Sequence, residues 1–284
     1  KTNIRVLFEV NMSSPRHFLV VAAASQGGRL FVKKALNQGH DVTALCRATD
    51  DQGALDRITR LISDATLTPG GVPVAEVKGR LQAYHSNILD PNTYITLLNG
   101  DTSIDGVCCF VGVTKIKEMF SKEHQLYTHT VGAIVEGMRQ SRWVELFYHG
   151  SSGSEGPPGQ NIAKLPENYT PKWLITPFLH MPAVKNYLES ESILAQAIAE
   201  GLLFVIFRPA FLTNGPAKRK YGYSFDTTGM DKEELPLRNT TMSISREDVS
   251  EEILRVATLR GKDRKQWFSH GVYLADFKKK IAEN

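Results

Sequence analysis

The segment Phe18–Arg47 constrains the fold of this chain more than any other stretch of its sequence. It begins with an apolar run, Phe18–Ala24, which is too short to span a membrane and has the length of a buried strand. A turn of small residues, Ser25–Gly28, is followed by an amphipathic segment, Arg29–Gln38, whose apolar residues recur at helical spacing. Asp41–Cys46 is typical of a second strand. A strand, a tight turn, a helix and a strand within about 30 residues predict a βαβ unit.

The turn between the first strand and the helix is the predicted phosphate-binding site. Backbone N–H groups at a helix N-terminus and the helix dipole both favour an anion there. Glycines are usual in such a turn, because they allow a tight bend, close approach of the backbone to the pyrophosphate and close packing of the helix on the strand. The sequence Ala22–Gly28 keeps only part of that pattern. We expect the phosphates to be lined by Ala24, Ser25, Gln26, Gly27 and Gly28.

After Arg47 the chain continues as alternating helical and strand patterns. The predicted helices are Ala54–Ser63, Asp90–Leu98, Lys122–Gln140 and Ala183–Glu200. The predicted strands are Gln82–Ser86, Gly106–Gly112, Val144–Gly150 and Leu203–Arg208. Ser245 is the predicted N-cap of a closing helix that begins within Ser243–Val249. This alternation predicts an α/β fold with a doubly wound parallel sheet of the Rossmann type, and it places the ligand at the carboxyl ends of the strands.

Composition narrows the classes of protein that fit. A hydrophobic content of 42% in 284 residues is enough for a large core, which argues against disorder. The net charge of +4 comes without a long basic run, so we expect no nucleic-acid partner. Cys46, Cys108 and Cys109 lack metal-ligand and disulfide spacing, so we expect no metal. With no signal peptide or membrane span visible, we expect a cytoplasmic protein that acts on a small molecule away from membranes, in an oligomeric state that the sequence leaves open.

Four segments carry a resemblance to a known family. The first is Ala22–Gly28, which stands where that family has G-A-T-G-x-x-G and keeps only Gly28 in register. The others follow later in the same order as in the family: Ser151-Ser152, Leu202–Pro209 and Ser243–Val249. Together they resemble the NmrA-like branch of the atypical short-chain dehydrogenases/reductases. Ala22 replaces the turn glycine, at a cost of roughly 1 kcal/mol or more if that position needs a positive φ.

The resemblance covers Arg16–Ala275 and implies a single NAD(P)-binding Rossmann domain over residues 16–284. Residues 1–15 are interpreted as an extension, with a family-like start at Met12. Segments 153–182 and 211–242 are expected to form a small irregular substrate lobe. Its aromatic residues suit a bulky apolar ligand, although aromatic residues more often belong to a core; they are Trp173, Phe178, Phe211, Tyr221, Tyr223 and Phe225.

The resemblance implies a nicotinamide dinucleotide, and the residue at the end of the second strand favours NADP(H) over NAD as that cofactor. An acid about 20 residues after the glycines bonds the ribose 2′-hydroxyl of NAD, whereas an arginine there accommodates the 2′-phosphate of NADP. Arg47 holds this position, with a solvated strand-end arginine as the plainer alternative, and Arg29 either adds to the pocket or is a surface residue. Asn87 stands where the family has an acid near the adenine. The remaining expected cofactor residues are Gly112, Val113, Thr114, Lys115, Lys185 and Pro209.

The resemblance also implies a catalytic arrangement. Short-chain reductases donate a proton from a tyrosine whose pKa is lowered by a lysine four residues later, while a Ser or Thr holds the substrate oxygen. Lys185 and Glu189 resemble the pattern Y-x-x-x-K-x-x-x-E, but the tyrosine position is Met181, which cannot donate a proton. Tyr169 and Tyr187 are alternative acids, and Tyr187 is expected to point elsewhere on the helix. The expected catalytic residues are Lys185, Ser151, Ser152 and His180.

Three functions from different classes fit these residues. The first is an NADP(H)-dependent reductase of a bulky organic substrate, possible without the tyrosine because hydride transfer to an iminium or activated alkene needs no strong acid. The second is a cyclase or cycloaddition enzyme of secondary metabolism that uses the cofactor pocket without net redox chemistry. The third is a non-enzymatic regulator that binds a dinucleotide and a protein partner, like NmrA.

Overall fold

The computed structural model describes residues 14–65, 68, 78–100, 103–112, 121, 125–151, 182–225 and 243–276. The main sheet has the strand order β3-β2-β1-β4-β5-β6-β10-β8. Its strands are β1 (His17–Val21), β2 (Asp41–Cys46), β3 (Leu81–His85), β4 (Gly106–Cys109), β5 (Glu145–His149), β6 (Phe204–Pro209), β8 (Tyr221–Phe225) and β10 (His270–Asp276). A second sheet pairs β7 (Phe211–Thr213) with β9 (Ser243–Ser245). The helices are α1 (Gln26–Asn37), α2 (Asp51–Ser63), α3 (Pro91–Asn99), α5 (Leu126–Gln140), α7 (Pro182–Ala197), α8 (Arg246–Thr258), α9 (Lys262–Lys265) and a 3-10 turn, η3 (Ile198–Glu200).

The sheet is doubly wound, as the sequence predicts. Neighbouring strands from β3 to β10 are parallel, and only β8 pairs antiparallel with its neighbour, β10. The chain starts at β1, proceeds outward to β3, and then returns to the other side of β1 as β4. This reversal is the topological switch point, at which open α/β sheets bind ligands beyond the carboxyl ends of the strands.

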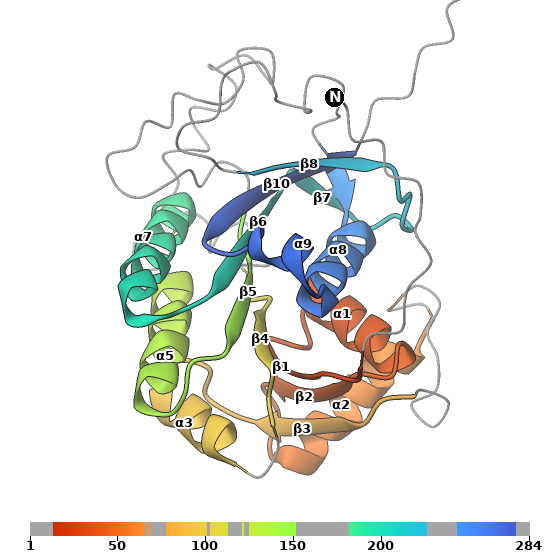
Figure 1. The fold of residues 1–284 in the computed structure, drawn as a ribbon. Helices are drawn as coiled ribbons and strands as arrows, with labels where there is room; N and C mark the ends of the chain where they lie inside the picture. Colours follow the sequence, from red (N-terminus) through yellow and green to blue (C-terminus); the bar gives the residue numbers. More distant parts are fainter. Residues whose placement is uncertain are drawn as a thin grey trace, which may run out of the picture.

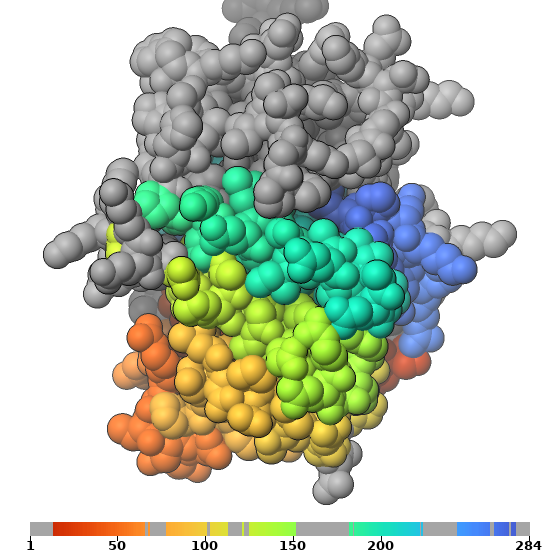
Figure 2. Space-filling model, turned by 90° about the vertical axis from the view of Figure 1, so that its left-hand side faces the viewer, coloured from red at the N-terminus to blue at the C-terminus, as the bar shows by residue number. Residues whose placement is uncertain are grey.

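Helices cover both faces of the sheet (Figure 1). On one face lie α1, α2 and α8, and on the other lie α3, α5 and α7, which Figure 2 shows side by side. Successive strand residues therefore enter opposite cores: Phe18 and Cys108 belong to one, and Leu19 and Cys109 to the other. Because both faces are buried, β1 and β4 are apolar throughout, as central parallel strands require. Cys46, Cys108 and Cys109 are free thiols buried in these cores.

The C-terminal part of the sheet differs from the sequence-based expectation. Tyr221–Phe225 is an edge strand paired with β10, and Phe211–Thr213 pairs with Ser243–Ser245, so these parts of segment 211–242 are regular sheet. Their hydrogen-bond partners lie 30 or more residues away in the sequence, and for that reason the local pattern did not reveal them. Segment 153–181 and residues 226–242 lie outside the described residues.

Candidate functional site

The turn between β1 and α1 ends in a helix N-terminus with available amide hydrogens. Ala22, in the place of the family's turn glycine, has a φ of 57°, which is the left-handed conformation that glycine adopts without strain. Ser25 is the N-cap of α1, and its Oγ accepts a hydrogen bond of 3.0 Å from the Gly28 amide. In the described part of the chain, the amide hydrogens of Gln26 and Gly27 donate to no acceptor. Such free groups at a helix N-terminus are what an anion binds.

The two glycines of this turn have different roles. A Cβ on Gly28 would lie 2.5 Å from the carbonyl oxygen of Ala22 and 2.9 Å from the Cα of Ala23, so this position requires glycine for the contact between α1 and β1. A Cβ on Gly27 would lie 3.1 Å from the ring of Phe110 and would crowd a side chain instead of the backbone. The helix also starts at Gln26, three residues before the predicted start, because Ser25 caps it.

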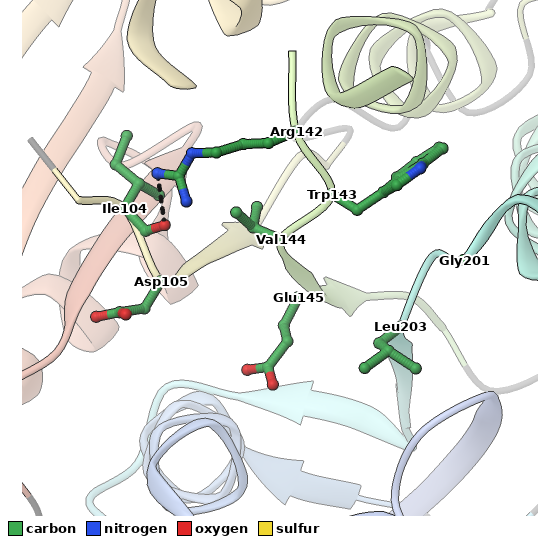
Figure 3. A pocket seen from close by; sticks show the side chains of 8 residues that line it. All are labelled: Ile104, Asp105, Arg142, Trp143, Val144, Glu145, Gly201 and Leu203. Atoms are coloured by element: carbon green, nitrogen blue, oxygen red, sulfur yellow. Dashed lines mark hydrogen bonds between the residues drawn. The ribbon is translucent and has the colours of Figure 1, made fainter. Parts of the chain in front are cut away.

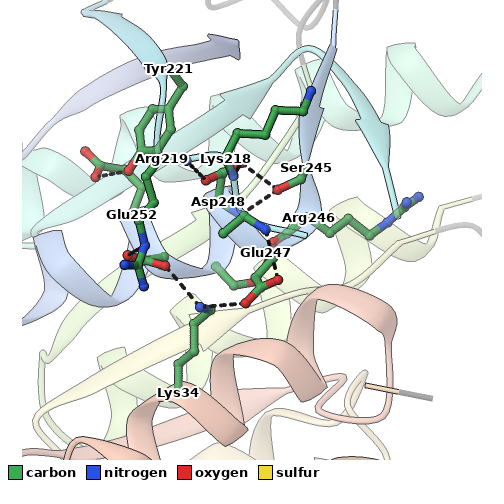
Figure 4. A network of polar contacts seen from close by, with 12 residues as sticks. Lys34, Lys218, Arg219, Tyr221, Ser245, Arg246, Glu247, Asp248 and Glu252 are labelled. Atoms are coloured by element: carbon green, nitrogen blue, oxygen red, sulfur yellow. Dashed lines mark hydrogen bonds and ion pairs between the residues drawn. The ribbon is translucent and has the colours of Figure 1, made fainter. Parts of the chain in front are cut away.

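Helix α8 is bonded to both ends of α1. Ser250 Oγ donates a 3.2 Å hydrogen bond to the carbonyl oxygen of Gly27, and the Lys34 ammonium lies 3.1 Å from both Glu247 and Glu251. The α8 N-terminus is built as the sequence predicts, with Ser245 as the N-cap accepting from the amide of the third helical residue. Figure 4 shows how Lys34 and the acidic residues of α8 converge.

The same helix start fixes the loop that leads into β8. The buried carboxylate of Asp248 accepts hydrogen bonds from the amides of Lys218 and Arg219, at 3.0 and 2.8 Å. Glu247 accepts one from the amide of Ala217, at 3.0 Å. Deeper in the network, the Tyr221 hydroxyl donates to the buried Glu252 carboxylate (Figure 4). These contacts make the first turn of α8 a rigid support beside the switch point.

The end of β2 carries the residue that the sequence assigns to the ribose. Arg47 is exposed, and its carbonyl oxygen accepts a 2.6 Å hydrogen bond from the guanidinium of Arg57 on α2. His85, the last residue of β3, accepts from the Ala48 amide at 3.0 Å and so ties the two strand ends together. Asn87 is also exposed, and its Oδ1 accepts from the Leu89 amide in a turn that leads into α3. Arg57 is a second basic residue that the sequence analysis did not assign to this end.

The ends of β4 and β5 meet beside the α1 turn. The ring of Phe110 lies 5.8 Å from that of His149, the last residue of β5. Burial lowers the pKa of His149 to about 4, so the imidazole is neutral at pH 7 and acts as a hydrogen-bonding group, not as a cationic acid. Gly112 is exposed, and a Cβ added to it would lie within 4 Å of no atom of the described residues. Ser151, half-buried, follows two residues after His149. His149 was not among the predicted site residues, and its signal in the sequence is a histidine at the end of a mostly apolar strand, just before Gly150.

Helix α7 carries the predicted lysine on its solvent side. The Lys185 side chain is 78% exposed, and its ammonium lies 3.8 Å from the carboxylate of Glu189, one helical turn later. Tyr187 points elsewhere, as predicted: its ring stacks on that of Tyr127 in α5 with centroids 3.7 Å apart. Burial raises the pKa of Tyr187, which makes it a poor proton donor. A contact between Lys185 and the cofactor ribose stays a prediction.

Two buried polar contacts fix α7 against the rest of the domain. Asn186 Oδ1 accepts from the Tyr127 amide at 2.8 Å, so a side chain of α7 caps the N-terminus of α5. The Arg208 guanidinium at the end of β6 pairs with the Glu191 carboxylate through two hydrogen bonds, of 3.2 and 2.6 Å, and both side chains are buried. A Cβ on Gly150 would lie 3.6 Å from this carboxylate, so the ion pair lies directly beside the end of β5. Pro209, expected at the cofactor, is buried next to it.

The remaining predicted site residues lie outside the described residues. For the cofactor these are Val113, Thr114 and Lys115. For catalysis they are Ser152 and His180, together with Met181 at the tyrosine position and Tyr169.

A cavity of about 320 Å³ lies at the opposite edge of the sheet, at the amino ends of β4, β5 and β6 (Figure 3). Its polar groups are engaged within the protein. Arg142 donates to the carbonyl oxygens of Leu98 and Ile104, and Glu145 pairs with Arg16 at 2.9 Å and with Arg264. This cavity is therefore part of the structural framework at that edge.

Among the described residues, no group of three or more His, Cys, Asp or Glu side chains is placed to hold a metal ion. None of the described helices combines the length and the apolar character that a bilayer crossing requires.

No protein-family model and no curated protein sequence matches the chain. Solved structures share its fold. The terminal R domain from the myxalamid PKS-NRPS biosynthetic pathway superimposes with a TM-score of 0.62 at 15% identity, over 95% of this chain and 70% of that domain.

Two further structures match over more than nine-tenths of both chains. A short-chain dehydrogenase/reductase from Veillonella parvula, in complex with NADP, has a TM-score of 0.57 at 15% identity, over 95% and 97% of the two chains. An oxidoreductase from Lactococcus lactis has a TM-score of 0.56 at 10% identity, over 93% and 92%. The chain therefore has a Rossmann-type fold, shared with these solved structures, and this fold is consistent with the resemblance of its sequence to the atypical short-chain dehydrogenases/reductases.

Proposed function

We propose that the protein is an NADP(H)-dependent oxidoreductase that acts on a bulky organic substrate. The observation that carries the proposal is the start of α1, where the Gln26 and Gly27 amides are available and Gly28 allows the helix to approach β1. A dinucleotide pyrophosphate bound there places the nicotinamide toward the ends of β4 and β5, beside Phe110 and His149. Ser25 caps the helix through its hydroxyl oxygen, and its hydroxyl hydrogen is still available to donate to a phosphate oxygen.

Arg47 supports the choice of NADP(H). Its exposed side chain at the end of β2 is available to the 2′-phosphate, and Arg57 lies close enough to bond its carbonyl oxygen. Two guanidinium groups at one strand end favour an additional phosphate, because charge-assisted hydrogen bonds to phosphate are strong. The NADP complex of a protein with the same fold is in line with this choice.

The substrate side lacks the usual proton donor. Met181 occupies the tyrosine position, and His149 is neutral at pH 7. We therefore propose substrates that accept hydride without protonation by a strong acid, such as imines and activated alkenes. Secondary metabolism is a suitable setting, since the R domain of a polyketide and peptide pathway shares the fold. A cyclase that uses the cofactor pocket without net redox chemistry is the second candidate, favoured by the same missing tyrosine.

Titration with NADPH and NADH, followed by nicotinamide fluorescence, tests the proposal. We expect the protein to bind NADPH more tightly than NADH. Arg47→Ala should weaken the affinity for NADPH by about tenfold or more and leave the affinity for NADH unchanged. Consumption of NADPH with a panel of imines and enones then separates the reductase from the cyclase. Loss of turnover in Lys185→Ala is expected, and full turnover in that variant contradicts its catalytic role. Tight binding of dinucleotide without turnover of any substrate favours a regulator.

A further inference from the structure

The arginines of the described chain differ in how their charge is compensated. Six of them are buried or half-buried. Four of these form ion pairs with carboxylates, namely Arg16, Arg208, Arg255 and Arg264. The other two, Arg29 and Arg246, have no carboxylate within ion-pair distance in the described part of the chain. Both lie in the first turn of a helix, α1 for Arg29 and α8 for Arg246.

Arg246 lies beyond the carboxyl edge of the sheet. It directly follows β9, which is parallel to β7 with Ser245 opposite Thr213. Its guanidinium donates to Asn214 Oδ1 at 2.5 Å and to the carbonyl oxygen of Leu212 at 3.4 Å, and both of these acceptors are neutral. Figure 4 shows the Arg246 side chain extending away from Lys34, from Asp248 and from the other acidic residues near them.

This position disfavours a cation twice. The helix dipole places partial positive charge at the α8 N-terminus, where acidic residues are preferred and where Glu247 and Asp248 follow. Partial burial removes water from the guanidinium, and this desolvation is the cause that lowers the pKa of Arg246. A half-buried charge without a counter-ion costs free energy that a neutral residue would not. An anionic ligand would supply the missing partner.

The surroundings indicate which ligand this is. The charge of Arg246 reaches His149, since it contributes, after burial, to the lowered pKa of that imidazole at the end of β5. On the neighbouring strand, Phe211 is a large apolar residue that is 62% exposed. The proposed pyrophosphate would have its own donors at the α1 start: the amides of Gln26 and Gly27 and, close by, the Nε of Arg29, which has no hydrogen-bond partner among the described residues.

We propose that Arg246 binds a carboxylate of the substrate, so that the enzyme acts on an apolar or aromatic molecule that carries an acid group. Arg246 is then a specificity-determining residue, and Asn214 orients its guanidinium through the 2.5 Å hydrogen bond. The inference rests on the proposed function, since it assigns the substrate of that same site. A phosphate of the cofactor is the other source of an anionic oxygen, and the test separates the two.

The experiment measures binding of 3-phenylpropanoate and benzoate, and of their methyl esters, by calorimetry with and without NADPH. The variants are Arg246→Met and Arg246→Lys. The matched control is Arg142→Met. Among the described residues Arg142 also has no carboxylate partner, and it donates to the main-chain carbonyl oxygens of Leu98 and Ile104, but it lies at the amino edge of the sheet. We expect Arg246→Met to weaken the affinity for the carboxylates roughly tenfold to hundredfold, which is the effect of losing a charge-assisted hydrogen bond. The affinity for the esters should not change. Arg246→Lys retains part of the affinity, and Arg142→Met retains all of it.

Three results overturn the inference. The first is that the wild-type protein binds neither carboxylate more tightly than its methyl ester. The second is that Arg246→Met binds the carboxylates with the same affinity as the wild type. A loss of NADPH affinity in Arg246→Met with carboxylate binding intact assigns the arginine to the cofactor instead. Thermal unfolding shows whether the variants are folded. We expect an unchanged or higher Tm for Arg246→Met, because an uncompensated charge is removed. Failure of the wild type to bind NADPH contradicts the proposed function, and it is measured in a separate titration.

Discussion

Replacing Ala22 with glycine should stabilise the protein. Ala22 has a φ of 57° at the turn after β1, and an L-residue in this conformation costs roughly 1–2 kcal/mol. Glycine removes that strain but adds backbone freedom to the unfolded chain, which costs about 0.4–1 kcal/mol. The difference is a gain of about 0.5–1 kcal/mol, or about 1–4 °C in Tm for a domain of this size.

The neighbouring alanine provides the matched control. Ala23 is fully buried and is not among the described residues with positive φ. Ala23→Gly therefore loses a buried methyl group as well as backbone restriction, and we expect a loss of about 1–2 kcal/mol. Urea and thermal unfolding of the two variants should shift in opposite directions. If Ala22→Gly destabilises the protein as much as Ala23→Gly does, the left-handed turn and the reasoning built on it are refuted.

Three further predictions concern the groups around the site. Glu191→Gln should lower the free energy of unfolding in urea by about 3–5 kcal/mol, because it leaves the buried Arg208 guanidinium without its carboxylate. The double variant Glu191→Leu/Arg208→Met should recover most of that stability. Equal losses of stability in the single and double variants would contradict the role of the ion pair. His149→Gln should reduce the loss of stability between pH 6.5 and 4. The imidazole stays neutral in the folded state down to about pH 4 but is protonated in the unfolded state below about 6.5, so acid destabilises the wild type by at most about 3 kcal/mol. A variant that loses stability as steeply as the wild type over this pH range would contradict the prediction. Asn186→Ala should cost about 1–2 kcal/mol by uncapping α5, and a change below about 0.3 kcal/mol would show that the cap is dispensable.

The order of elements up to β6 was predictable from the sequence because it is written in local patterns. An apolar run such as Phe18–Val21 is apolar because both faces of a central strand are buried, and α1 shows its amphipathic stripe directly. The closing helix was also predictable, since Ser245 caps it through its own side chain. The edge strand β8 was not, because the residues that stabilise Tyr221–Phe225 belong to β10, about 50 residues later.

The candidate site was predictable where it depends on backbone geometry. A phosphate turn follows from a strand, small residues and a helix, and Arg47 follows from its distance to Gly28. Arg246 was not predictable, because the absence of a counter-ion is a property of the packed structure. The sequence places Glu247 and Asp248 next to it, yet in the fold those carboxylates bond Lys34, Ala217 and Lys218. His149 was missed for a similar reason, since its low pKa comes from burial by distant segments.

We propose that the free amides at the start of α1 bind a dinucleotide. One substitution removes such an amide N–H group with little other change. Gln26 is the first residue of α1, where proline is well tolerated, and Ser25 before it has φ −65° and ψ 163°, an extended conformation that precedes proline without strain. Gln26→Pro therefore deletes an N–H group at the proposed pyrophosphate site while leaving the helix intact. Gln26→Ala removes the side chain and keeps the amide, so it is the control.

Titration of the wild type and both variants with NADPH is the most direct measurement. We expect the wild type and Gln26→Ala to bind NADPH with equal affinity, and Gln26→Pro to bind it with an affinity at least about tenfold lower. The Tm should be the same in all three proteins. Equal NADPH affinity in Gln26→Pro, or no NADPH binding by the wild type, would contradict the proposal.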